Sequence, residues 1–334
     1  MQEKISILGA GGWGTTLAVV LCGNNNLEVT LWSPFPEQVE QIVKKRENKD
    51  FLPSVKIPYN LKITSDLKAA LANDLIILAL PVEHLSSCLQ RIKSTKINLK
   101  GKLFLSVMKG IEVKSLKRPS EILHETLRLP YKQIAVLSGP TIAKEVARGM
   151  PTAAAVASRS YKNARRVQKV FELTNLRLYT HRDMAGIETA GALKNIIAIA
   201  CGISDGLKFG TNTKSAIISR GLKEMIRFAK AYRMGESAFL GISGIGDLCT
   251  TCFSQFSRNR FVGEEVAKGK TLKEVLAKMK MVAEGVTTVK SVYNLSRKNN
   301  IDMPITKEIY LILYKNKLPM AAVKDLMNRP LKDE

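Results

Sequence analysis

The sequence predicts an α/β protein with an N-terminal doubly wound, mostly parallel sheet and an all-helical C-terminal part. Short apolar runs alternate with helix-like stretches as far as about residue 181. One run, Leu75–Leu80, is apolar throughout, as expected for a parallel strand covered on both faces. Beyond about residue 186 the strand signals stop, and apolar residues recur with the 3.6-residue period of helices. We therefore expect two domains, 1–186 and 187–334, which a chain of 334 residues can furnish with separate cores.

The first elements surround a glycine-rich loop. Ile5–Leu8 reads as a buried strand, Gly9, Gly11 and Gly14 fit G-x-G-x-x-G, and Thr15–Gly23 reads as a helix. This order is the Rossmann fingerprint for a dinucleotide: the glycines permit a tight turn, close approach of the pyrophosphate, and close helix–strand packing. The helix N-terminus adds unpaired N–H groups for the anion. The alternative is a glycine-rich turn in another α/β protein.

The second strand, Glu28–Trp32, bears on the choice of cofactor. In NAD-specific sites an acid often ends this strand and holds the ribose 2′-hydroxyl. Here the strand is followed by Ser33-Pro34, and the first acid is Glu37. NADP is therefore permitted and NAD is not excluded. A helix is expected next, over Pro36–Asn48, with proline at a starting position.

The later strands carry polar residues at their ends. They are expected at Lys102–Val107, Gln133–Leu137, Thr152–Ser158 and Arg177–His181, with a helix over 161–173. Ligands of doubly wound sheets gather beyond the carboxyl ends of the strands. Lys109, Gly139 and Thr141 follow the first two of these strands and should lie at that edge. For Lys109 the alternative is a solvated loop lysine.

The helical part contains the candidate acid–base group. Its helices are expected at about 187–208, 212–233, 258–268, 271–278, 287–298 and 303–315. Lys194 interrupts a strongly apolar helix, where a lysine can serve as an acid or base, or can extend its amine back to the surface. Asp247, between glycines and an apolar residue, either pairs with Lys194 or caps a helix.

Two further segments offer polar groups to an anion. Ser257-Arg258-Asn259-Arg260 combines hydroxyl, guanidinium and amide groups, and an arginine fork suits a phosphate. The segment could equally be surface. Glu284 lies in a segment typical of a helix entry, where an exposed glutamate is the plain interpretation.

Composition limits the class of protein. The net charge is +23, which suits anionic partners, but the basic residues are spread along the chain without a nucleic-acid-binding motif. No apolar run reaches the length of a membrane span, and the first strand starts too early for a signal peptide. Five scattered cysteines, of which Cys249 and Cys252 form one C-x-x-C, indicate a reducing compartment and no metal site. A cytoplasmic protein that binds no nucleic acid and does not insert stably into membranes is expected.

Several ordered motifs together resemble one family. The chain resembles the bacterial NAD(P)-dependent glycerol-3-phosphate dehydrogenases over nearly its whole length. The resemblance rests on GAGGWGTTLA at 9–18, MKGIE at 108–112, SGPTIAKEVA at 138–147, GALKNIIAIACGISDGL at 191–207, GIGDLCTTC at 244–252, SRNR at 257–260 and AEGVTT at 283–288. Departures are Thr141-Ile142, where Ser-Phe is common, and Thr16, where alanine is usual.

The resemblance implies roles for individual residues. The lysine matching Lys194 is the family's catalytic acid and base. Substrate contacts are implied for Lys109, Gly139, Thr141, Lys194, Asp247, Ser257, Arg258 and Asn259. Cofactor contacts are implied for Gly12, Trp13, Ser33, Lys109, Ala143, Arg258, Val282 and Glu284, in addition to the loop glycines Gly9, Gly11 and Gly14.

The expected activity is the reversible reduction of dihydroxyacetone phosphate to sn-glycerol 3-phosphate with NADPH or NADH, which supplies glycerophospholipid synthesis. Family members are often homodimers. One alternative is a related dehydrogenase acting on another small hydroxy or keto acid. A second alternative is a non-catalytic dinucleotide sensor or a basic nucleic-acid-binding protein.

Overall fold

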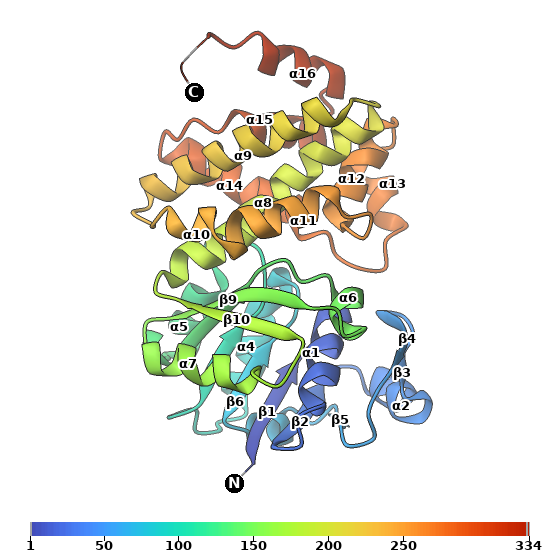
Figure 1. The fold of residues 1–334 in the computed structure, drawn as a ribbon, viewed down its shortest axis with the longest axis vertical. Helices are drawn as coiled ribbons and strands as arrows, with labels where there is room; N and C mark the ends of the chain where they lie inside the picture. Colours follow the sequence, from blue (N-terminus) through green and yellow to red (C-terminus); the bar gives the residue numbers. More distant parts are fainter. Residues whose placement is uncertain (1, 332, 334) are drawn as a thin grey trace. The chain divides into compact units, whose positions relative to one another are not determined.

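The computed structural model describes residues 2–331 and 333, which fall into two compact units. The first runs to Lys109 and resumes over Lys117–Glu188, and the second takes Gly110–Leu116 and the chain from Thr189 onward. The first unit is coloured mainly blue to green in Figure 1 and holds the sheet, and the second is mainly yellow to red and is helical. The short excursion at 110–116 was not foreseen from the sequence.

The first unit is built on an eight-stranded sheet with the order β10-β9-β8-β7-β6-β1-β2-β5. All neighbouring strands are parallel except β8 and β9. The strands are β1 (Glu3–Leu8), β2 (Leu27–Trp32), β5 (Lys62–Thr64), β6 (Leu75–Leu78), β7 (Leu103–Ser106), β8 (Ile134–Ser138), β9 (Thr152–Ser158) and β10 (Leu176–His181). The central strands are fully buried, which explains their continuous apolar runs. The predicted doubly wound sheet is confirmed.

Helices surround this sheet and fill the connections between parallel strands. They are α1 (Gly12–Cys22), α2 (Pro36–Lys45), α3 (Leu67–Leu71), α4 (Leu85–Ser94), α5 (Pro119–Leu127), α6 (Ala143–Ala147) and α7 (Tyr161–Val170). The predicted helix over Pro36–Asn48 is too long. Arg46 ends α2 in the left-handed conformation, and Glu47–Asn48 forms β3, which pairs with β4 (Leu52–Lys56). Local periodicity did not reveal this pairing because it depends on residues further along the chain.

The second unit is helical, as predicted. Its helices are α8 (Met184–Gly206, which begins in the first unit), α9 (Thr211–Ala231), α10 (Ser237–Leu240), α11 (Asp247–Phe253), α12 (Arg258–Ala267), α13 (Leu272–Ala277), α14 (Glu284–Lys298), α15 (Pro304–Lys315) and α16 (Pro319–Met327). A π-helical turn, Ile242–Gly246, precedes α11. Of the described helices, α8 is long and apolar enough to cross a membrane, but its apolar window is completely buried in the protein. Burial of this kind is typical of the core helix of a soluble protein.

Candidate functional site

The glycine loop between β1 and α1 fits a dinucleotide. Gly9 has φ +118°, and a Cβ there would lie 2.5 Å from the carbonyl oxygen of Ala79. A Cβ on Gly14 would lie 1.9 Å from the carbonyl oxygen of Gly9. In contrast, a Cβ on Gly11 would meet no atom within 4 Å. The fold itself therefore needs two of the glycines, and the third leaves open the space through which a pyrophosphate can approach the backbone.

Neighbouring elements hold this loop in place. The buried hydroxyl of Thr16 lies 2.8 Å from the carbonyl oxygen of Gly12 and 3.1 Å from that of Ala143, where α6 begins. Thr16 thus links two positions that the family resemblance assigns to the cofactor. Trp13, in the first turn of α1, packs against the apolar core of the unit.

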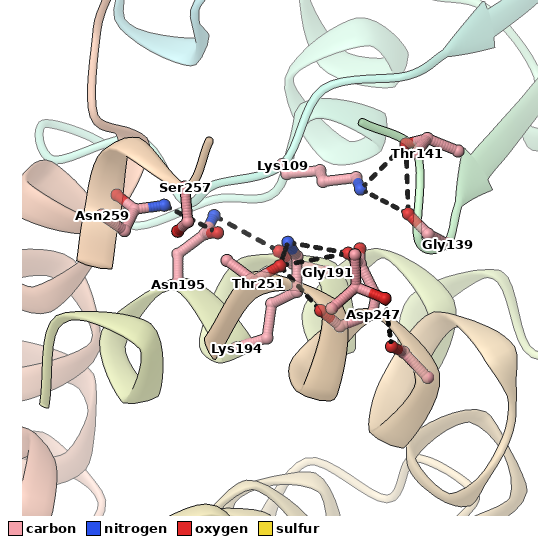
Figure 2. Close-up of polar contacts among 12 residues, drawn as sticks. Lys109, Gly139, Thr141, Gly191, Lys194, Asn195, Asp247, Thr251, Ser257 and Asn259 are labelled. Atoms are coloured by element: carbon pink, nitrogen blue, oxygen red, sulfur yellow. Dashed lines mark hydrogen bonds and ion pairs between the residues drawn. The ribbon is translucent and has the colours of Figure 1, made fainter. Parts of the chain in front are cut away.

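Lys109, Gly139 and Thr141 meet at the carboxyl edge of the sheet, where β7 and β8 run in parallel. Lys109 Nζ donates to the carbonyl oxygen of Gly139 at 2.8 Å and lies 3.4 Å from Thr141 Oγ1 (Figure 2). The Thr141 hydroxyl donates to the same carbonyl oxygen at 3.1 Å. The predicted meeting of these residues is confirmed, and Lys109 is a bonded, half-buried side chain rather than a solvated loop lysine.

In the second unit, Lys194 of α8 and Asp247 of α11 form a buried ion pair. Lys194 Nζ lies 2.9 Å from Asp247 Oδ1, and their side chains are 5% and 2% exposed. Lys194 Nζ also donates to Thr251 Oγ1 at 2.5 Å, and the Thr251 hydroxyl donates to the main-chain carbonyl oxygen of Asp247 at 2.7 Å (Figure 2). Asp247 does not cap α11, because Gly246 occupies the cap position. The pairing predicted for Asp247 is therefore the one the structure contains.

In the segment 257–260, Ser257 and Arg260 make contacts within the protein, whereas Arg258 is exposed to solvent. Ser257 caps α12 by accepting from Arg260 N–H at 3.2 Å, and Arg260 pairs with Asp205 at 2.5 Å. Arg258 remains accessible to solvent. Desolvation by the surrounding protein lowers the pKa of its guanidinium below the ordinary value, while Glu284 acts in the opposite direction. An accessible guanidinium is suited to an anionic ligand.

Asn259 is buried within a network of side-chain amides. Its Nδ2 donates to Asn195 Oδ1 at 2.9 Å (Figure 2). Its Oδ1 accepts from the backbone N–H of Gly285 at 2.9 Å. A Cβ on Gly285 would lie 2.7 Å from Asn259 Oδ1, so only glycine fits there. This bond fixes the start of α14, where Glu284 is the first residue and Val282 lies two residues ahead.

Sequence reasoning missed Asn195 and Thr251 as members of the site. Thr251 stands four residues after Asp247, which places both on one face of a helix. That spacing could have indicated the contact, had a helix been predicted there. Asn195 offered a weaker signal, a polar residue next to Lys194 in an apolar helix.

Comparisons with known proteins agree with this geometry. Family models described as the N-terminus and the C-terminus of NAD-dependent glycerol-3-phosphate dehydrogenase match residues 4–164 and 183–324. The chain is 45% identical over 332 residues to the glycerol-3-phosphate dehydrogenase [NAD(P)+] of Prosthecochloris aestuarii, with 99% of both chains covered. It is 46% identical to that of a Thermoanaerobacter species, with 99% of this chain and 98% of the relative covered.

Solved structures extend the match to three dimensions. The crystal structure of glycerol-3-phosphate dehydrogenase from Coxiella burnetii superposes with a TM-score of 0.92 at 34% identity, covering 98% of this chain and 99% of that one. The Plasmodium falciparum enzyme gives a TM-score of 0.88 at 32% identity, with 99% and 97% covered. With both halves of the chain matched by family models and full-length relatives well above 30% identity, the chain belongs to the NAD-dependent glycerol-3-phosphate dehydrogenase family.

Proposed function

We propose that this chain catalyses the reversible, NAD(P)H-dependent reduction of dihydroxyacetone phosphate to sn-glycerol 3-phosphate. The observation that carries the proposal is the Lys194 ammonium group, buried against Asp247 and Thr251. A buried charge is costly unless it is paired, and a paired lysine that keeps labile protons is suited to acid–base work. Family membership supplies the substrate class.

Lys194 is the proton donor in this proposal. In reduction, one N–H bond of its ammonium group breaks, and the proton goes to the ketone oxygen as that oxygen gains charge. In oxidation, the neutral amine takes the proton from the hydroxyl group of the substrate. Asp247 Oδ1 and Thr251 Oγ1 hold the amine in one orientation. The nicotinamide, when bound, supplies or accepts the hydride.

Arg258 is the proposed phosphate ligand. Its accessible guanidinium can form a bidentate contact with phosphate oxygens. Asn259 supports this role, because its amide joins the first turn of α12 to Asn195 on α8 and to the start of α14. Ser257, as the helix cap, orients the same turn. Binding energy from the phosphate would align the reacting ketone.

The remaining predicted contacts are retained as proposals. We assign Lys109, Gly139 and Thr141 to the substrate, and Lys109 and Arg258 to both ligands. The other cofactor contacts are Gly9, Gly11, Gly12, Trp13, Gly14, Ser33, Ala143, Val282 and Glu284. We retain 1–186 as the dinucleotide-binding domain and 187–334 as the substrate-binding and catalytic domain, with each domain adding some contacts to the other ligand. We further propose that the protein is a cytoplasmic homodimer without stable membrane insertion, and that its product supplies glycerophospholipid synthesis.

A ketone panel tests the activity. Purified protein with NADH or NADPH should oxidise the cofactor with dihydroxyacetone phosphate, and much more slowly with dihydroxyacetone or pyruvate, which lack the phosphate group. At saturating cofactor, Arg258→Gln should raise KM for dihydroxyacetone phosphate while leaving the weak reaction with dihydroxyacetone unchanged. Equal rates with phosphorylated and unphosphorylated ketones would contradict the proposal and favour a dehydrogenase for another keto compound.

A further inference from the structure

A buried polar network lies just beyond the end of β2. Ser33 is 1% exposed, and its hydroxyl donates to Gln38 Oε1 at 2.5 Å. The backbone N–H of Phe35 donates back to Ser33 Oγ at 3.3 Å. The single proton of the Ser33 hydroxyl is therefore used within the protein, and this buried group offers no donor to a ligand.

The same network reaches the glycine loop. Gln38 Nε2 donates to the carbonyl oxygen of Ala10 at 3.0 Å, which fixes the orientation of the Gln38 amide. Asn48, which is 3% exposed, donates to the same carbonyl oxygen at 2.8 Å and contacts Thr15 Oγ1 at 2.8 Å. The segment after β2 is thus tied to the loop that is proposed to receive the pyrophosphate. The side-chain amide donors of Gln38 and Asn48 are engaged by the Ala10 carbonyl oxygen in this loop.

The charges and backbone donors of this segment disfavour an additional phosphate. Pro34 and Pro36 have no N–H group, and Glu37 places an exposed carboxylate in the first turn of α2. The segment 33–43 contains two acidic residues and no lysine or arginine. In dinucleotide sites an acid near this strand accepts from a ribose 2′-hydroxyl, whereas a 2′-phosphate is accommodated by an arginine.

The nearest basic residues along the chain lie away from the end of β2. Lys44 and Lys45 are in the last turn of α2, about 12 Å along the helix from its first residue at 1.5 Å per residue. Arg46 directs its guanidinium to the carbonyl oxygens of Pro58 and Leu61. From another element, Arg91 of α4 lies over the ring of Trp32, 5.4 Å from its centroid. Arg91 is the rival contact for a 2′-phosphate.

We propose that the segment Ser33–Gln38 selects the cofactor without a 2′-phosphate, so that this chain uses NADH in preference to NADPH. The inference rests on the proposed function, because it assumes that the loop Gly9–Gly14 binds a nicotinamide dinucleotide. The exposed Glu37 carboxylate accepts hydrogen bonds from ribose hydroxyls, and the buried Ser33 hydroxyl has no proton to give to a phosphate oxygen. A 2′-phosphate dianion would find the hydrogen-bond donors of this segment already engaged within the protein, and it would be repelled by the Glu37 carboxylate. Both effects weaken the binding of NADPH.

Equilibrium binding tests this without turnover. Titration calorimetry with NADH and NADPH should give a Kd at least about tenfold lower for NADH, the ratio that corresponds to one lost charge-assisted hydrogen bond. Phe35→Arg, at a position 65% exposed, should tighten NADPH about tenfold and leave NADH unchanged. Phe35→Gln is the matched control, with a similar change in size and polarity but no charge, and should leave the ratio as it is.

Three outcomes would overturn the inference. The first is NADPH binding as tightly as NADH. The second is a selective loss of NADPH affinity in Arg91→Gln, which would make that arginine the 2′-phosphate ligand. The third is binding of neither nucleotide, which removes the dinucleotide site and the proposed function with it. Preferential binding of NADH without reduction of dihydroxyacetone phosphate would contradict the proposed function alone.

Discussion

Lys194 illustrates how one residue joins stability to chemistry. Its ammonium group and the Asp247 carboxylate are both almost fully buried. The attraction between the two charges compensates for the hydration that each group loses on burial. Thr251 contributes a third polar atom at 2.5 Å from Nζ. Such a group is expected to matter for turnover and for folding alike, and the two effects can be separated by the choice of variants.

Lys194→Met should lower kcat by about 10²–10⁴-fold, the range typical for loss of a general acid or base, with the Kd for NADH unchanged. Because the variant removes the ammonium group from the buried Asp247 carboxylate, it should also lose about 3–5 kcal/mol of unfolding free energy. Lys194→Met combined with Asp247→Asn should regain much of that stability without regaining turnover. Steady-state kinetics, calorimetry and urea unfolding measure the three quantities.

The control is Lys223→Met, which removes an exposed lysine from α9 in the same unit. It should change neither kcat nor stability appreciably. Turnover by Lys194→Met at the rate of this control would remove Lys194 from the mechanism.

At the scale of elements, buried carboxylates attach helices to one another. Glu224 of α9 accepts hydrogen bonds at the start of α15: from Ile305 N–H at 2.8 Å, and from the backbone N–H and hydroxyl of Thr306 at 2.9 Å and 2.6 Å. The side chain is 1% exposed. The first N–H groups of a helix have no partner within that helix. The Glu224 carboxylate of α9 therefore caps the N-terminus of α15.

Glu224→Gln should destabilise the second unit by about 1–3 kcal/mol. Both carboxylate oxygens accept hydrogen bonds, and in the variant an NH₂ group would replace one of them and face a buried donor at Ile305 or Thr306. Glu236→Gln is the matched control, since Glu236 pairs with Lys230 at the surface and should contribute less than about 1 kcal/mol. Urea unfolding followed by far-ultraviolet circular dichroism measures both. A Glu224→Gln midpoint equal to that of the control would show that the buried contacts add no stability.

Glu188 gives a prediction for pH. Its carboxylate accepts from the backbone N–H of Ser120 at 2.9 Å and from the Ser120 hydroxyl at 2.6 Å, both in the first turn of α5. Burial raises the pKa of Glu188 above its ordinary value of 4.5, although Arg118 and these hydrogen bonds act against the rise. Between the unfolded and folded pKa values the folded state binds more protons, so this group lowers stability as pH rises.

The unfolding free energy of the wild type should therefore fall more steeply from about pH 4.5 upward than that of Glu188→Gln. Urea unfolding at a series of pH values gives the difference between the two curves. The neighbouring Glu121→Gln, a partly exposed partner of Arg118, is the control and should not flatten the curve in this way. A wild type that loses stability relative to Glu188→Gln as pH falls would mean that the folded pKa of Glu188 is lowered instead.

For the molecule as a whole, the dominant electrostatic property is the net charge of +23. A strongly positive protein attracts anionic ligands over distances limited by the Debye length, about 30 Å at 0.01 M salt and 8 Å at 0.15 M. Dihydroxyacetone phosphate and the dinucleotide are both anions. The charge is therefore expected to assist encounter rather than the chemical step.

kcat/KM for dihydroxyacetone phosphate should fall several-fold as salt rises from about 10 to about 150 mM, with kcat unchanged. The slow reaction of uncharged dihydroxyacetone is the internal control and should show a much flatter dependence. If the two substrates show the same salt dependence, the net charge does not contribute to substrate capture.

The sequence was most informative where one property is repeated locally. The sheet strands next to the glycine loop were predicted because their apolar runs are continuous, and the glycine spacing alone indicated the loop. The strands β3, β4 and β5 escaped prediction because they are short and partly exposed, and the partner of β5 is the distant strand β2. The end of α2 was misplaced because the two-residue strand β3, which follows it, was not recognised.

By itself, the sequence determined the alternation of the main sheet strands with helices, the change to a helical second half, and the residue types for dinucleotide and phosphate chemistry. Only the tertiary structure decided which interpretation of each residue holds. In the folded protein Asp247 pairs with Lys194, Ser257 caps a helix, and the Ser33 hydroxyl donates to Gln38 in the segment after β2. The physical reason is that periodicity and turn chemistry act between near neighbours. Ion pairs and amide networks form between groups that only folding brings within hydrogen-bond distance.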